Sequence, residues 1–125
     1  MLLDTNIVIY SCQTDGGWLT PWTAHADAAI ASVTRVEALG FVEITPAEES
    51  AIREYLGRCL AYPLDEGLIE RAIRLRQQKK MKLGDAFIVA TALEFGVPLV
   101  TRNVDDFKRV AGLEIINPFA GPESA

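Results

Sequence analysis

Short apolar runs that end at an acidic or hydroxyl-bearing residue alternate with helix patterns along the chain, and this alternation most constrains its fold. Strands are expected at 2–3, 28–33, 97–101 and 113–116, with a further candidate at 59–64 whose ladder bonding Pro63 limits. Strands separated by helices specify a parallel sheet covered on both faces. We therefore predict an α/β fold, a three-layer α/β/α sandwich around a mostly parallel sheet of about five strands.

Three longer helices have clear start or stop signals. Thr45, followed by a proline and two glutamates, predicts a helix that runs to about Arg58. Asp65 caps a second helix, whose apolar residues are spaced by threes and fours. A third helix opens at Asp85 and ends near Gly96, and because it is apolar nearly all round it is expected to be buried.

Shorter helical segments are predicted in the remaining stretches. One helix starts near Asn6, a second is capped by Thr34, and a third covers 103–110. Between them, 12–27 contains several turn signals and reads as irregular or partly helical.

The length and composition predict one domain over 1–120, followed by a frayed tail at 121–125. Half of the 125 residues are hydrophobic, which is enough to close a single core. No apolar run is long enough to span a bilayer and no leader pattern follows Met1, so we expect a cytoplasmic protein with no membrane association. Cys12 and Cys59 are interpreted as free buried thiols, and His25 as a surface histidine.

The net charge of −5 argues against nucleic-acid binding through a globally positive surface. The charge is unevenly distributed, however, because six of the twelve Lys and Arg residues fall within 71–82. This stretch has two interpretations, a local basic patch or the solvated face of an amphipathic helix.

Acidic residues from separate parts of the sequence are expected to meet at one edge of the sheet. Asp4 follows the first strand, Glu37 lies just beyond the second, and Asp85 lies in the first helical turn before the fourth. In parallel sheets the functional crevice lies beyond the carboxyl ends of the strands. Asp4 and Asp85 also have simpler interpretations as helix-start acids, as do Asp105 and Asp106. Glu37, in an apolar stretch, is harder to explain without a partner.

Carboxylates that lie close together repel one another and resist losing their water, so such a pocket implies a bound cation. A hard divalent metal is the candidate that best suits oxygen ligands.

The phrases that carry these acids resemble those of a known family. They are Leu-Leu-Asp-Thr-Asn at the start, Ser-Val-Thr-Arg-Val-Glu at 32–37, Asp-Ala-Phe-Ile-Val-Ala-Thr-Ala from Asp85, and Val-Thr-Arg-Asn-Val-Asp-Asp-Phe before a closing Ile-Asn-Pro. In this order the phrases are similar to those of PIN-domain ribonucleases and, more narrowly, of the VapC-type toxins of toxin–antitoxin pairs.

The resemblance implies a catalytic metal site made by Asp4, Glu37 and Asp85, with a fourth ligand from 101–106. Many relatives have an aspartate two residues after the threonine, where this chain has Asn103. Asn103 can bind a metal or a water through its carbonyl oxygen but lacks the charge, and Asp106 is the candidate for the missing carboxylate. The sequence therefore leaves open whether the site binds one metal ion or two.

The implied activity is that of an endoribonuclease in which water activated by Mg²⁺ or Mn²⁺ hydrolyses an RNA phosphodiester in line, leaving 5′-phosphate and 3′-hydroxyl ends. The residues expected to orient ligands or waters are Thr5, Asn6, Ser32 and Thr101. The cations expected to contact RNA are Arg102 and Lys82, with Lys79, Lys80, Lys108 and Arg109 as further backbone contacts.

The resemblance also implies an RNA substrate such as tRNA or rRNA, a homodimer, and a cognate antitoxin whose C-terminal segment occupies the active groove. Trp18 and Trp22 either stack on unpaired bases or, as we slightly favour, pack a dimer or partner surface.

The main alternative is a catalytically inactive PIN-like module that binds RNA or protein, which Asn103 makes plausible. A phosphatase of the haloacid dehalogenase type would need an acid where Asn6 stands. A phospho-acceptor receiver domain would need a lysine after a late strand, where this chain has Arg102.

Overall fold

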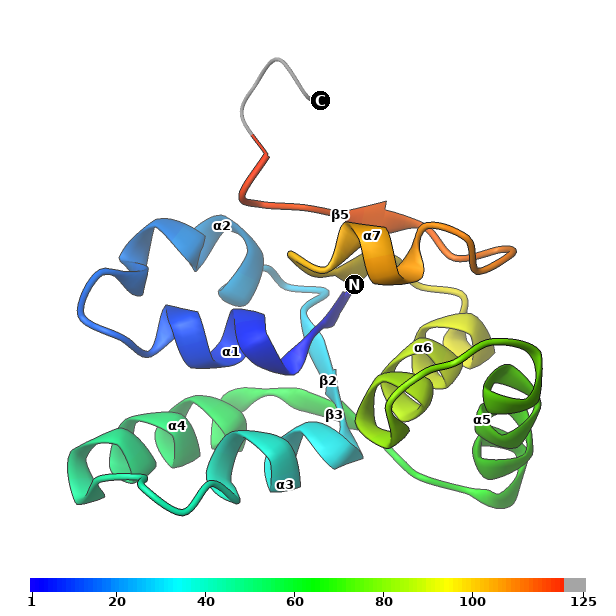
Figure 1. Ribbon diagram of the computed structural model, residues 1–125. Helices are drawn as coiled ribbons and strands as arrows, with labels where there is room; N and C mark the ends of the chain where they lie inside the picture. Colours follow the sequence, from blue (N-terminus) through cyan, green and yellow to red (C-terminus); the bar gives the residue numbers. More distant parts are fainter. Residues whose placement is uncertain (121–125) are drawn as a thin grey trace.

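The computed structural model describes residues 1–120 and places a five-stranded sheet at the centre of the chain (Figure 1). The strand order is β3-β2-β1-β4-β5, and all four neighbouring pairs are parallel. The predicted sheet is thus confirmed, and in the described residues it is entirely parallel. The strands are β1 (Leu2–Leu3), β2 (Ala29–Ala31), β3 (Leu60–Tyr62), β4 (Leu99–Val100) and β5 (Ile115–Ile116).

Helices pack on both faces of the sheet because successive strand residues point to opposite sides. Leu2 and Leu99 join a core with the helix α6, whereas their neighbours Leu3 and Val100 join a second core with α1. Figure 1 shows α1 and α4 on one side of the strands and α5 and α6 on the other, so the three-layer prediction is confirmed. The helices are α1 (Thr5–Ser11), η1 (Gly16–Leu19), α2 (Thr20–Thr23), α3 (Ser32–Leu39), α4 (Pro46–Arg58), α5 (Glu66–Gln78), α6 (Leu83–Phe95) and α7 (Val104–Phe107).

The predicted starts of α4 and α5 and the predicted end of α6 are confirmed. Thr45 and Glu48 form a capping box, with backbone-to-side-chain hydrogen bonds of 3.0 and 3.1 Å. Asp65 Oδ1 accepts a 2.9 Å hydrogen bond from the backbone of Leu68 at the start of α5. Gly96 ends α6 in the left-handed conformation, with φ of 63°.

Two predicted helix starts are wrong, and both lie beside the acidic edge. Helix α3 begins at Ser32 rather than after Thr34, whose side chain is fully buried instead of capping the helix. Helix α6 begins at Leu83, so Gly84 and Asp85 lie inside its first turn. Gly84 looked like a helix breaker in the sequence, but its lack of a side chain serves a tertiary contact with Glu37, described below.

The strand order creates a crevice between β1 and β4. From β1 the chain runs outward through β2 to β3, and it then returns to pair β4 with the other side of β1. Where connections from two neighbouring strands diverge in this way, an open space forms at their carboxyl ends. Asp4 and Thr101, the first residues beyond β1 and β4, lie at that space.

Other sequence predictions have mixed outcomes. Cys12 and Cys59 are free, as predicted, but both are half-buried rather than buried, because they lie at the margin of the core between α1 and α4. His25 is exposed, as predicted. Within residues 1–120, every helix is too short or too polar to cross a membrane. The tail predicted at 121–125 lies outside the described residues.

Candidate active site

Asp4 is the most buried acid of the site, with 4% of its surface exposed. Its Oδ1 accepts a 2.8 Å hydrogen bond from the backbone N–H of Thr5, which makes it the N-cap of α1, and its Oδ2 accepts one of 2.6 Å from Thr101 Oγ1. Burial raises the pKa of Asp4, the two hydrogen bonds oppose that rise, and the charge of Glu37 adds to it. Asp4 therefore caps α1 and lies in the acidic cluster at the same time.

Glu37 reaches the same edge from α3, where Thr5 Oγ1 donates a 2.7 Å hydrogen bond to its Oε1. The residue as a whole is exposed, and Thr5 is the partner that the sequence analysis expected for it. A long side chain can leave its stem in solvent and still bring its carboxylate to a buried hydroxyl.

Thr34 is a site residue that sequence reasoning missed as such. Its hydroxyl lies 3.1 Å from Thr5 Oγ1. Since Thr5 has one hydroxyl proton and gives it to Glu37, Thr34 must be the donor in its bond to Thr5. The sequence signal is a hydroxyl residue three positions before a glutamate on one helix, because residues at that spacing share a face.

Gly84 brings the first turn of α6 against the carboxylate of Glu37. A Cβ at this position would overlap Glu37 Oε2 and lie 2.8 Å from Glu37 Cδ. Glu37 is therefore held between the Thr5 hydroxyl and the backbone of α6, at the helix end that favours negative charge.

Asp85, half-buried in the same turn of α6, has a pKa raised to about 6. Burial is the largest cause, followed by the negative charges of Asp4 and Glu37. Lys82 opposes the rise, and Asp106 makes a further small addition. The three acids predicted from separate parts of the sequence are thus close enough to raise the pKa of one of them.

The structure distinguishes Asn103 from Asp106, the two candidates for the fourth ligand. Asn103 contacts the site through its backbone, whose N–H donates a 3.0 Å hydrogen bond to Thr101 Oγ1. Asp106, on α7, contributes to the raised pKa of Asp85 and lines a cavity of about 660 Å³ together with Asp85 and Lys82. Asp106 therefore carries the negative charge that Asn103 lacks.

Comparison with known proteins agrees with this geometry. A model of the PIN domain family matches residues 1–113, which include all four acids and the three threonines described above. This chain belongs to the PIN domain family. The resemblance predicted from the sequence phrases is confirmed.

Relatives of this PIN domain are VapC proteins and toxin–antitoxin complexes. Ribonuclease VapC1 of Rickettsia felis is 30% identical over 128 residues, covering 93% of this chain and 94% of the relative. A toxin–antitoxin complex from Klebsiella pneumoniae contains a chain that is 31% identical, with a TM-score of 0.76 and coverage of 96% and 98%. VapBC2 of Rickettsia felis, bound to a promoter DNA fragment, is 22% identical with a TM-score of 0.77 and coverage of 93% and 96%, and shows the fold.

The donor set of this PIN domain suits a hard divalent cation. In residues 1–120, no three His, Cys, Asp or Glu side chains lie close enough to form a ready-made metal cluster. The available groups are nevertheless carboxylate, amide and hydroxyl oxygens, the ligands that Mg²⁺ and Mn²⁺ prefer. The carboxylates that raise the pKa of Asp85 create a negative field that a cation would relieve.

The residues predicted to orient ligands fall into two groups in this PIN domain. Thr5 and Thr101 donate hydrogen bonds to Glu37 and Asp4, as their predicted role requires. Ser32 instead donates a 2.7 Å hydrogen bond to the backbone carbonyl of Tyr62 at the end of β3. Asn6 is exposed on α1. The structure thus brings the threonines to the acids and directs the serine toward the neighbouring strand.

Arg102 follows Thr101 and stacks on an aromatic ring. Its guanidinium carbon lies 4.6 Å from the ring centre of Phe119, which in turn packs edge-on against Trp18 at 4.8 Å. Trp18 also contacts Trp22, with ring centres 6.3 Å apart, and is 47% exposed. Sequence reasoning missed Phe119.

Proposed function

We propose that this PIN domain is a metal-dependent endoribonuclease and the toxin of a toxin–antitoxin pair. The observation that carries the proposal is the approach of Asp4, Glu37 and Asp85, from three separate elements, at the crevice between β1 and β4. The relatives support it, since the VapC1 protein at 30% identity is named a ribonuclease and the chain at 31% identity belongs to a toxin–antitoxin complex.

Asp4, Glu37 and Asp85 would hold Mg²⁺ or Mn²⁺, with Asp106 or Asn103 in the fourth position. When bound, such an ion makes hydroxide available near neutral pH and offsets negative charge on the phosphate under attack. The oxygen donors fit this role, and no side-chain nucleophile is required.

The protein groups have separate tasks in this mechanism. Thr101 and the Thr5 backbone orient the two oxygens of Asp4, while the Thr5 hydroxyl orients Glu37. Asp85 has a pKa of about 6, so it is mostly ionised at neutral pH and available as a ligand. Arg102, which follows Thr101 in the chain and stacks on Phe119, would provide a cation to attract the substrate's phosphates.

The same proposal includes the partners and the location. The substrate is an RNA such as tRNA or rRNA, the chain forms a homodimer in the cytoplasm, and an antitoxin peptide with a basic side chain occupies the acidic groove. The toxin–antitoxin complex among the relatives supports the antitoxin partner, and the relative named a ribonuclease supports an RNA substrate.

A cleavage assay with matched variants tests the activity. Purified protein is incubated with tRNA and unstructured RNA in Mg²⁺ or Mn²⁺, beside Asp4→Asn, Asp85→Asn and, as control, Asp15→Asn. Asp15 is exposed and makes no capping hydrogen bond, so its variant should cleave like the parent. Losing a metal ligand removes several kcal/mol of transition-state stabilisation, so both site variants should lose at least about a hundredfold in rate.

Two outcomes would contradict the proposal. Cleavage that persists in both site variants would exclude the metal site. No cleavage of any RNA by a folded parent would favour the alternative, an inactive module that binds RNA or protein.

A further inference from the structure

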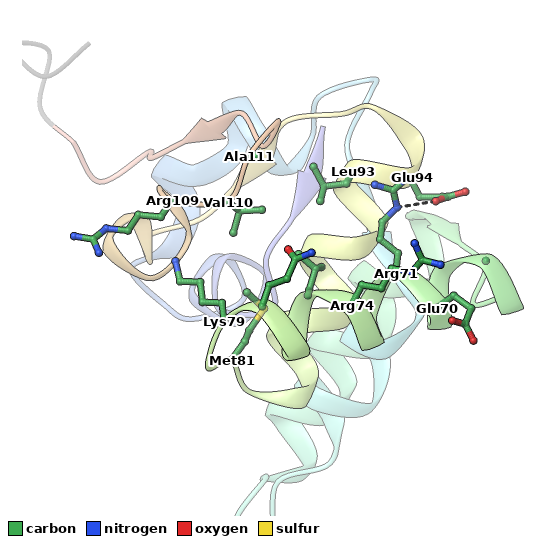
Figure 2. A pocket seen from close by; sticks show the side chains of 13 residues that line it. Glu70, Arg71, Arg74, Lys79, Met81, Leu93, Glu94, Arg109, Val110 and Ala111 are labelled. Carbon is green, nitrogen blue, oxygen red and sulfur yellow. Dashed lines mark hydrogen bonds and ion pairs between the residues drawn. The ribbon is translucent and has the colours of Figure 1, made fainter.

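A groove of about 930 Å³ lies between α5, the end of α6 and the residues that follow α7 (Figure 2). Apolar side chains such as Leu75, Met81 and Val110 line it together with several long cations. Figure 2 shows Arg71 and Arg74 toward one end of this groove and Lys79 and Arg109 toward the other. The catalytic acids do not line it.

The charges in the groove are unequally neutralised. Arg71 donates a 2.9 Å hydrogen bond to Glu94, drawn as a dashed line in Figure 2, and this ion pair satisfies it. Arg74, Lys79 and Arg109 have no carboxylate within ion-pair distance among residues 1–120. Glu70 also lines the groove without an ion pair among residues 1–120, but three such cations outnumber it, so in a chain with a net charge of −5 the groove is suited to an anionic ligand.

The groove continues toward the acidic site. Lys79, Met81 and Arg109 line both this groove and the cavity of about 660 Å³ that contains Asp85 and Asp106. Lys82 adds a further cation to that cavity, whereas Lys108 in the same cavity is paired with Asp105 at 3.1 Å. Cations therefore lead from the edge of the carboxylates to the far end of α5. A ligand that follows them must carry negative charge along its length, which a nucleic acid strand does.

We propose that this groove holds the RNA strand on one side of the cleaved bond, with Lys79 and Arg109 on the phosphates nearest the site and Arg74 on one farther away. The inference rests on the proposed ribonuclease function and extends it to the path of the substrate. Of the two interpretations of the stretch 71–82, this proposal favours a basic patch over a solvated helix face, for the residues that face the groove.

Metal-free RNA binding tests the path separately from cleavage. Fluorescence anisotropy in EDTA is measured with oligouridines of about 4 and about 16 nucleotides over a range of salt concentrations. The variants are Lys79→Gln with Arg109→Gln, and Arg58→Gln as control, because Arg58 is exposed at the end of α4 on the other side of the sheet.

Each lost phosphate contact lowers the slope of log affinity against log salt by about 0.7 for a single strand. The double variant should therefore lose about 1.4 in slope with the longer RNA, and a similar amount with the shorter one, because Lys79 and Arg109 contact the phosphates nearest the site. The control should match the parent with both. A double variant that keeps the parent slope would overturn the inference. So would a double variant that binds RNA normally but loses a protein partner, since the groove would then be a protein site.

The two proposals can fail independently. If no RNA is cleaved but the slope falls as expected, the ribonuclease function is wrong and the groove still binds RNA. If cleavage depends on Asp4 and Asp85 but the slope does not change, the function holds and the path is wrong.

Discussion

Thr34 is fully buried, yet it determines where a carboxylate points at the surface. Its hydroxyl donates to Thr5, and the Thr5 proton is thereby directed to Glu37. Without the donor, the Thr5 hydroxyl would be free to rotate, and Glu37 would lose the direction of its partner. A buried residue with no contact to substrate is in this way a positioning residue for the site.

Exchanging the Thr34 hydroxyl for a methyl group separates this role from packing. Thr34→Val keeps the shape but removes a buried hydrogen bond worth about 1 kcal/mol, so cleavage should fall about fivefold and stability by about 1 kcal/mol. Thr34→Ser keeps the hydroxyl and loses a methyl, so it should cost about 1 kcal/mol of stability and retain activity. Cleavage kinetics and urea unfolding measure the two effects. Equal loss of activity in both variants would show that Thr34 acts through packing alone.

The residues predicted from sequence are those whose signals are local. Asp4 ends an apolar run and Asp85 opens a helical turn, so each can be placed on the functional edge from its neighbours in the chain. The exposure of Glu37 and the role of Thr34 depend instead on how α3 meets α1 and α6 in space. No local pattern contains that information.

At the scale of elements, helix α6 shows how a local rule can mislead. Glycine is a poor helix former, so Gly84 suggested that the helix starts after it. The helix in fact includes Gly84, because the carboxylate of Glu37 occupies the space where a side chain would be. The three long helices were otherwise well predicted from caps and spacing. The first strand was predicted correctly at 2–3, whereas the other four were predicted too long, since an apolar run does not show where its ladder ends.

Gly84→Ala should uncouple stability from activity. The new methyl meets the flexible end of Glu37, which can move away, so a gain in helix propensity of up to about 1 kcal/mol is retained while Glu37 leaves its position. Cleavage should fall at least tenfold, which corresponds to a rise of about 1.4 kcal/mol in the activation free energy when Glu37 is misplaced.

Gly57→Ala in α4 is the matched control, since a Cβ there meets nothing within 4 Å. It should gain similar stability and keep full activity, measured by thermal unfolding and RNA cleavage. Full activity in the Gly84 variant would show that the position of Glu37 is not needed.

For the whole molecule, the acidic site makes stability depend on pH. Asp85 has a pKa raised from 3.8 to about 6, so the folded state binds its proton more tightly than the unfolded state. Between those values the folded state holds more protons, and stability falls as pH rises through this window. Burial, the largest cause, is reinforced by Asp4, Glu37 and Asp106, while Lys82 opposes it. The pKa of Asp4 is also raised, chiefly by burial.

Without divalent ions, Asp85→Asn should be more stable than the parent at pH 8, and the difference should shrink as pH falls toward about 4. Mn²⁺ at a hundredfold excess over its dissociation constant should stabilise the parent by about 2.7 kcal/mol at pH 8, and EDTA should reverse the effect. The stability of Asp85→Asn should change little on addition of Mn²⁺ or EDTA. Urea unfolding across pH provides the measurement, and a pH-independent difference between parent and variant would contradict the assigned pKa.

The hydrogen bond between Asp4 and Thr101 joins residues 97 positions apart, across the central pair of strands. During synthesis Asp4 leaves the ribosome first, but its strand cannot gain this neighbour until β4 has also emerged. Strand pairing over such a distance is slow because the loop must close before the contact forms. The acids therefore come together late, and we expect the proposed catalytic site to stay incomplete until nearly the whole chain has been made.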